Sequence, residues 1–137
     1  MDIQVYNADK ELILNTKPIV YACTGCSNVA RIAHDIALTL DSDGLAEMSC
    51  VSGVVGNVAP IKAIAKSGRK IIAIDGCSLS CTKAGLNTCD IKPDFYFTIT
   101  DLGIDKRDKW QDSLTDNSLA INSIYKALDK EGINFVR

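Results

Sequence analysis

Six cysteines carry most of the reactive chemistry in this sequence of 137 residues. They fall in three groups: Cys23 and Cys26; Cys50; and Cys77, Cys81 and Cys89. Thiolates bind soft metal ions such as zinc, and two thiols a few residues apart suit a single ion. The spacing therefore predicts a metal–thiolate cluster, provided that the fold brings the three groups together.

Each group comes at the carboxyl end of a predicted strand. Residues 18–22 and 70–74 are short apolar runs rich in β-branched side chains, which is typical of strands buried on both faces. Residues 45–51 predict a second strand with Cys50 near its end, and residues 94–100 a fourth. Alternating residues 3–6 indicate an additional edge strand.

Helical patterns follow these strands. Ser27 or Asn28 can cap a helix through about residue 40, and Asn57 a second helix, with residues 52–56 as a connection. Ser78 can cap a helix that has Cys81 in its first turn, and the last helix covers residues 115–130. The alternation predicts a single doubly wound α/β domain over residues 1–137, in three layers. Its parallel sheet would have at least four strands, in the order 2-1-3-4.

In a parallel sheet the carboxyl ends of all strands meet at one edge, and neighbouring strands lie about 4.8 Å apart. Thiols at three adjacent strand ends can thus reach a common centre, and thiols at two helix N-termini can close it. Zinc takes four sulfur ligands at about 2.3 Å. For these four places we predict five candidate ligands: Cys23, Cys26, Cys50, Cys77 and Cys81.

Two further residues are placed in the second shell of this centre. Asp75 precedes Gly76 at a strand end, where it can accept hydrogen bonds from loop N–H groups or act as an Asx-turn residue. Cys89 lies beyond the helix and would pack against the site or shield it. His34, the one histidine, falls two helical turns from Cys26 and is not expected to be a ligand.

The tripeptide Asp75-Gly76-Cys77, together with CTGCS at residues 23–27 and Cys50, resembles the DGC-domain family. These are small prokaryotic proteins, named for the Asp-Gly-Cys tripeptide and described as zinc-binding. The resemblance extends over roughly residues 18–130. It implies a metal–thiolate protein and supplies no reaction.

Other chemistries suit the same residues. A strand followed by Cys-Thr-Gly and a helix is similar to the phosphate loop of low-molecular-weight tyrosine phosphatases and arsenate reductases, whose arginine comes six residues after the cysteine. Here Val29 holds that position, and Arg31, about 200° further round the helix, is expected to point away from the loop. Thiol redox chemistry at Cys23 and Cys26 and an iron–sulfur cluster remain alternatives.

Composition and charge indicate which partners and which compartment to expect. The net charge of −2 is spread without a basic stripe, so nucleic acid is not an expected partner. No apolar run is long enough for a membrane span, and the opening residues do not form a signal peptide, which predicts a soluble cytoplasmic protein. The expected partner is a metal ion; the sequence identifies no protein partner. No histidine or glutamate is placed as a general base, so a metal-binding module is favoured over a hydrolytic enzyme.

Overall fold

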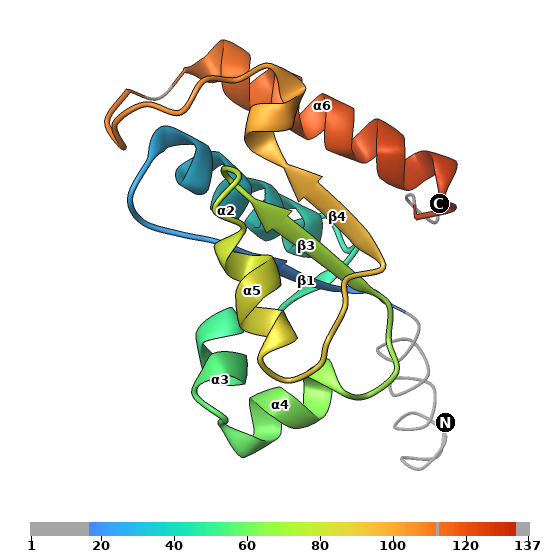
Figure 1. The fold of residues 1–137 in the computed structure, drawn as a ribbon. Coiled ribbons are helices and arrows are strands. Elements are labelled where there is room, and N and C mark those ends of the chain that lie inside the picture. The colour runs from blue at the N-terminus through green and yellow to red at the C-terminus, as the bar shows by residue number, and fades with distance from the viewer. Residues whose placement is uncertain (1–16, 112, 134–137) are drawn as a thin grey trace.

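A four-stranded parallel sheet forms the centre of the structure, a computed structural model that describes residues 17–111 and 113–133 (Figure 1). Its strands are β1 (Ile19–Ala22), β2 (Glu47–Met48), β3 (Ile71–Asp75) and β4 (Phe95–Thr98), in the order β2-β1-β3-β4. Every neighbouring pair is parallel. The predicted parallel α/β class and strand order are confirmed. The strand predicted over residues 3–6 lies outside the described residues.

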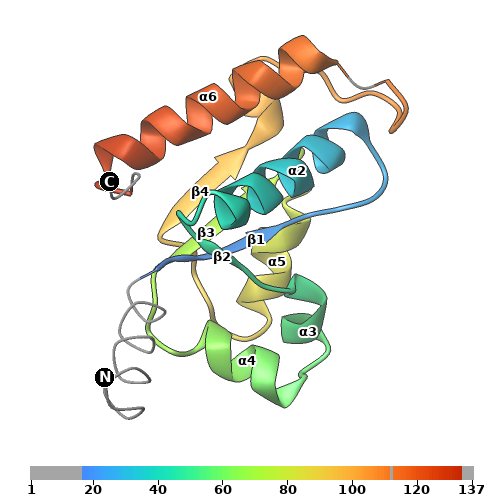
Figure 2. The same ribbon diagram turned by 180° about the vertical axis from the view of Figure 1, so that it is seen from behind.

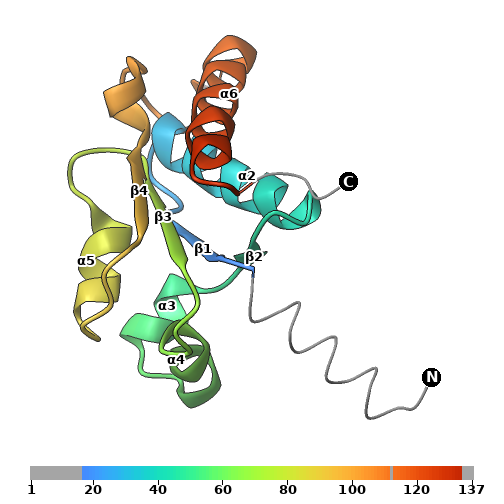
Figure 3. The same cartoon turned by 90° about the vertical axis from the view of Figure 1, so that its right-hand side faces the viewer.

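In the part of the chain that the structure describes, six helical segments connect and flank the strands (Figure 2). They are α2 (Asn28–Ser42), α3 (Val51–Val55), α4 (Ala59–Ala65), α5 (Cys81–Asn87), the 3-10 helix η1 (Ile99–Leu102) and α6 (Leu114–Lys130). In Figure 3, α2 and α6 lie on one side of the sheet, whereas α5 lies on the other. No helix among the described residues is long and apolar enough to cross a lipid bilayer.

The two faces of the sheet bury separate apolar clusters, because neighbouring residues of a strand point to opposite faces. Val20, Ile72 and Ile74 pack with residues of α2 and α6, whereas Tyr21 and Ala73 pack on the face that α5 covers. Burial on both faces explains why β1 and β3 have continuous apolar sequences without alternation. It also gives the fold an apolar core that does not depend on the cysteines.

The second strand is the main difference from the prediction. It comprises Glu47–Met48 alone, and the residues from Val51 onwards form α3, where the sequence pattern had predicted the strand end and a connection. Helix α3 packs against its neighbours closely: a Cβ on Gly53 would lie 2.7 Å from Ile61 Cγ2. A five-residue helix is stable only through such packing, which a local pattern does not reveal.

Two predicted helix caps are also wrong. The cap of α4 is Val58 instead of Asn57, and the cap of α5 is Ser80 instead of Ser78. Ser80 has φ of 55° and makes no side-chain capping bond. The first turn of α5 therefore takes its hydrogen-bond acceptor from elsewhere in the fold.

Candidate functional site

The cysteine loops after β1 and β3 touch each other at Gly76. The Gly76 N–H donates to Cys23 Sγ at 3.1 Å, and the Cys23 N–H donates to the Ile74 carbonyl at 3.2 Å. A Cβ on Gly76 would lie 2.6 Å from the backbone nitrogen of Ala30, at the start of α2. Only glycine allows this close approach of two backbones, so Gly76 sets the distance between the two loops.

Asp75 supplies the acceptors that the first turn of α5 needs. Its buried carboxylate accepts hydrogen bonds from the N–H groups of Thr82 at 2.7 Å and Lys83 at 3.1 Å. The Tyr96 hydroxyl donates to the same carboxylate at 2.8 Å. A negative charge at a helix N-terminus interacts favourably with the helix dipole. Asp75 therefore holds α5, and with it Cys81, against the end of β3.

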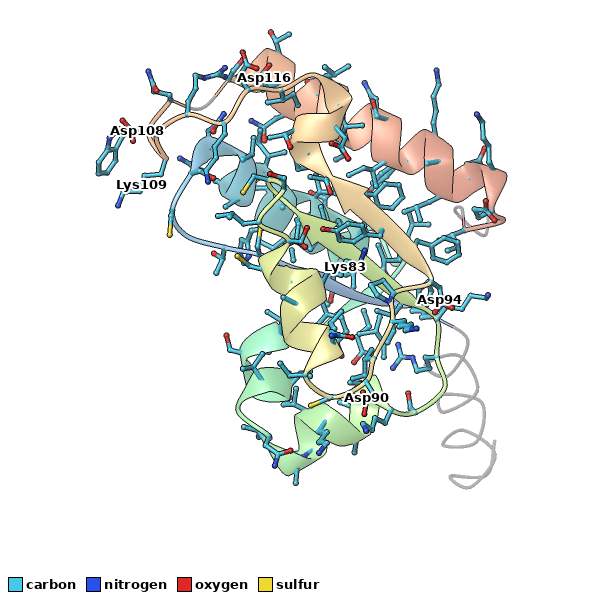
Figure 4. The ribbon with its side chains drawn as sticks, in the orientation of Figure 1. Lys83, Asp90, Asp94, Asp108, Lys109 and Asp116 are labelled. Carbon is cyan, nitrogen blue, oxygen red and sulfur yellow. The ribbon has the colours of Figure 1, made fainter. Side chains whose placement is uncertain are left out.

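Figure 4 labels Lys83 on this helix, and its Nζ lies 4.7 Å from the centroid of the Tyr96 ring. The cation thus covers the ring whose hydroxyl binds Asp75. Asp75, Lys83 and Tyr96 form one connected network behind the start of α5. The sequence indicated Asp75 as an acceptor of N–H groups but gave no indication of Tyr96, which lies on another strand.

Three thiols lie around the contact between the loops. Burial raises the pKa of Cys23 from its ordinary 9.0 to about 11; the Gly76 N–H opposes this shift, while Asp75, Cys81 and Cys77 add to it through negative charge. Cys77 Sγ lies 3.4 Å from the Lys106 ammonium. Cys81, the first residue of α5, is exposed. Cys23, Cys77 and Cys81 are called the thiol cluster below.

The other two predicted ligands, Cys26 and Cys50, are not among the groups that shift the pKa of Cys23. Cys26 is exposed in the loop before α2, and Cys50 is exposed immediately before α3. Cys89 lies beyond the C-terminal end of α5, where its Sγ is 3.5 Å from the Val54 carbonyl oxygen. Its surroundings belong to the apolar cluster beneath α5.

In residues 17–111 and 113–133, no three His, Cys, Asp or Glu side chains are positioned as a ready-made ligand set for one ion. The donor chemistry of the thiol cluster fits a soft metal, but the geometry requires side-chain rotation. Rotation is feasible at Cys81 and Cys26 because both side chains are exposed. The choice of cysteines as metal ligands remains a prediction.

Asn28, which the sequence offered only as a candidate helix cap, helps to place the loops through its side chain. Asn28, buried at the start of α2, donates to the Asp105 carbonyl at 2.9 Å and accepts from the Arg107 N–H. These bonds bring the segment with Lys106 beside Cys77. Pairs separated by 77 and 79 residues have no local signal; the one available hint was an amide side chain inside an apolar helical pattern.

The predicted orientation of Arg31, away from the loop, stays a prediction. Arg31 lines a surface hollow together with Thr24 and Gly25. Cys23 is not among the described residues that line this hollow. A thiol with a pKa of about 11 is largely protonated at neutral pH, which disfavours Cys23 as a free nucleophile. The phosphatase-like alternative remains less favoured than metal binding on this ground.

Comparison with known proteins agrees with the resemblance seen in the sequence. The family model described as the DGC domain matches residues 19–124, a span that contains all six cysteines. The curated "Anaerobic and virulence modulator AnvM" of Pseudomonas aeruginosa is 50% identical over 90 residues, which are 66% of this chain and 69% of the relative. No solved structure matches the chain. With most of its length matched by the family model, the chain belongs to the DGC domain family.

Proposed function

We propose that the protein is a metal-binding module in which the thiol cluster binds one thiophilic ion, with zinc as the expected metal. Cys26, three residues after Cys23 and exposed, is the candidate for the fourth ligand. The observation that supports the proposal is the proximity of Cys77 and Cys81 to Cys23, close enough for their charges to oppose its ionisation. A bound cation would remove this repulsion and would favour the deprotonated form of all three thiols.

The surroundings of the thiol cluster suit a metal thiolate. The Gly76 N–H donates to Cys23 Sγ, and the Lys106 ammonium lies beside Cys77 Sγ. Groups of this kind orient ligands from outside the first coordination shell and tune the affinity for metal. Buried Asp75 adds negative charge behind the thiols, which attracts a cation. Bound metal would hold the thiolates together and fix the two loops relative to each other.

A binding role agrees with the chemistry better than turnover does. The pKa of Cys23 is raised, so the metal-free thiol is a poor nucleophile at neutral pH. The name of the Pseudomonas aeruginosa relative describes a modulator. We infer that the chain acts through the metal-dependent state of its two loops, in a reducing compartment such as the cytoplasm, where thiols stay free.

The test is metal binding by the full chain and by three single variants, Cys23→Ser, Cys77→Ser and Cys81→Ser. After removal of metal with a chelator, a competition titration with a chromophoric zinc indicator should give one equivalent of zinc per wild-type chain. Each variant should lose about 100-fold or more in affinity, because a metal ligand is removed from the first shell. Cys89→Ser, at the far end of α5, is the matched control and should bind like wild type.

Failure of the wild-type chain to bind any zinc, with all six thiols freely titratable, would refute the proposal. Equal loss in Cys89→Ser would show that the variants act through folding. A brown protein that contains iron and labile sulfide, when purified without added metal, would replace zinc by an iron–sulfur cluster.

The metal should organise the loops without being required for the fold. Val20, Ile72 and Ile74 belong to a buried apolar core; Cys23 and Cys77 pack against this core but are only partly buried. We therefore expect chelation to increase amide exchange in residues 23–27 and 76–81, while far-UV circular dichroism stays nearly constant. Global unfolding on chelation would instead identify a structural metal comparable to that of a zinc finger.

A further inference from the structure

A surface hollow of about 590 Å³ lies between α5 and β4. β4 is an edge strand of the sheet, and the seven-residue α5 packs against β3, the strand beside it. The segment that leads from the end of α5 back to β4 forms another wall of the hollow (Figure 1). A short helix on this side of the sheet thus leaves a hollow whose size is typical of small-molecule sites.

The described lining of this hollow is mainly apolar. It includes Leu79, Ala84, Ile91 and Pro93, together with Tyr96 on β4. The Tyr96 hydroxyl is already bonded to the Asp75 carboxylate at 2.8 Å, so what Tyr96 offers a ligand is its ring. Leu79 is 70% exposed, and covering such a large apolar side chain is favourable. The wall therefore suits the apolar part of an organic molecule.

The charged groups of the hollow are both positive. Among its described lining residues, the charged ones are Lys83 on α5 and Lys92 on the returning segment. Within residues 17–111 and 113–133, neither ammonium forms an ion pair. Lys83 Nζ lies 4.7 Å from the centroid of the Tyr96 ring. Because an aromatic ring carries no net charge, this contact leaves the ammonium its full positive charge.

The nearby acidic residues do not offset these two cations. The Asp94 carboxylate accepts a hydrogen bond from the Ile71 N–H at 2.8 Å, and Asp90 lies beyond the end of α5, away from Lys83 in Figure 4. The buried Asp75 carboxylate accepts hydrogen bonds from the start of α5 and from Tyr96. None of the three carboxylates lines the hollow. The hollow therefore favours an anionic group.

We propose that this hollow binds a small organic anion with an apolar body. The anionic group would lie at the ammonium groups of Lys83 and Lys92, and the apolar body would lie against Leu79 and Pro93. The cysteines of the thiol cluster are not among the described residues that line the hollow. Binding of the anion thus does not depend on a bound metal.

Octanoate is the probe, because it combines a carboxylate with an apolar body, and isothermal titration calorimetry measures its binding to the full chain. We expect saturable binding of one octanoate per chain. Acetate and inorganic phosphate lack the body, octanol lacks the charge, and each should bind at least about tenfold more weakly. Acetate, phosphate or octanol binding as tightly as octanoate would overturn the corresponding half of the proposal. Absence of saturable octanoate binding would overturn all of it.

Variants at exposed positions locate the site without disturbing the core. Lys92→Gln should weaken octanoate binding about tenfold because a charged partner is lost, and Leu79→Gln by a comparable factor because the wall becomes polar. Lys126→Gln, the same charge change on the exposed surface of α6, is the control and should bind octanoate like wild type. Equal weakening by Lys126→Gln, or no weakening by Lys92→Gln, would refute the site. Lys92→Gln should bind zinc like wild type, so failure here leaves the metal proposal intact.

Discussion

The loops after β1 and β3 carry similar residues but are fixed in different ways. Both begin with a cysteine near a strand end and lead into a helix. The first loop has its own cap, because Ser27 Oγ accepts from the Ala30 N–H at 3.2 Å, and the 15-residue helix that follows is largely buried. In the second loop, Ser80 at the N-cap position makes no side-chain capping bond, so the first turn of α5 relies on Asp75, from the preceding strand. The loop after β1 is thus held by a cap from its own residues, whereas the loop after β3 is held by a carboxylate from the preceding strand.

Substitution at the glycines should break this arrangement most severely. In Gly76→Ala the new methyl group would meet the backbone of Val29 and Ala30 at 2.7 and 2.6 Å, and backbone cannot move aside as a flexible side chain can. We expect a loss of about 3 kcal/mol in the free energy of unfolding, measured in urea, together with weaker zinc binding.

The matched variant is Gly25→Ala in the first loop. Gly25 has φ of 112°, but nothing lies within 4 Å of the place that the new methyl group would occupy. The cost is therefore backbone strain alone, about 1 to 2 kcal/mol. Equal losses in the two variants would show that the contact between the loops does not control their spacing.

The thiols of the two loops should differ in reactivity when metal is absent. Since the pKa of Cys23 is about 11 instead of 9.0, its thiolate fraction at pH 8 is about 100-fold below that of an ordinary thiol. Alkylation followed by mass spectrometry should therefore modify Cys23 last, after exposed Cys26 and Cys81. The rate at Cys23 should rise about tenfold per pH unit up to pH 10.

The raised pKa of Cys23 also predicts how the stability of the fold depends on pH. The folded chain holds the Cys23 proton more tightly than the unfolded chain, so stability is independent of this thiol below pH 9 and falls as pH rises from 9.0 towards 11. Cys23→Ser should remove that part of the alkaline decline. Alkylation of Cys23 at the rate of Cys26 at pH 8 would contradict the burial of the thiol.

The parts of the fold that follow from local pattern were predictable. Residues 71–74 are apolar and β-branched, and their burial on both faces places them inside a parallel sheet. Cys23 and Cys77 follow the parallel strands β1 and β3 at the same edge of the sheet, as the strand pattern predicted. Long-range partners were not predictable: Tyr96, on another strand, donates to Asp75, and Lys106 reaches Cys77 across 29 residues. Such contacts depend on how loops pack, and a loop sequence does not specify its neighbours.

The position of Cys50 shows the same limit of prediction for the candidate metal site. The prediction placed it at the end of a long second strand, beside Cys23. The strand stops at Met48, and Cys50 lies two residues beyond its carboxyl end, immediately before α3, where it lines a surface hollow with Met48 and Val51. The position of α3 depends on its packing against Ile61 and Gly85, from two other helices. The strand pattern therefore placed Cys50 after the second strand but did not indicate the helix that begins beside it.

Removal of the Asp75 carboxylate, which caps α5 from the preceding strand, should have the next largest effect on the free energy of unfolding. Asp75→Asn loses the charge that accepts from Thr82, Lys83 and Tyr96, and an amide offers one acceptor oxygen in place of two. We expect a loss of about 2 kcal/mol in the free energy of unfolding, because hydrogen bonds to a buried charge are among the stronger ones. Hydrogen exchange should locate the change in the first turn of α5.

Asp116→Asn is the control for this variant. Asp116 lies in the first turn of α6 and pairs with Arg107, but the pair is partly exposed, so its loss should cost less than about 1 kcal/mol. Unchanged exchange at Thr82 and Lys83 in Asp75→Asn would mean that the helix start does not depend on this carboxylate.

The smallest expected change in the free energy of unfolding comes from replacing the N-cap serine of each loop by alanine. Comparison of the two variants tests whether each serine caps its helix. Ser27→Ala removes a nearly buried oxygen that accepts from the Ala30 N–H, and it should cost about 1 kcal/mol in urea denaturation. Ser80→Ala keeps the Cβ, so the backbone strain at φ of 55° does not change. It removes two contacts of the hydroxyl: the 2.9 Å approach to the Tyr96 hydroxyl, which keeps its bond to Asp75, and a long bond of 3.4 Å to the Ser78 carbonyl. The expected cost is therefore only about 0.3 kcal/mol. Similar costs for the two variants would mean that Ser80 is a genuine cap and that both loops are held locally.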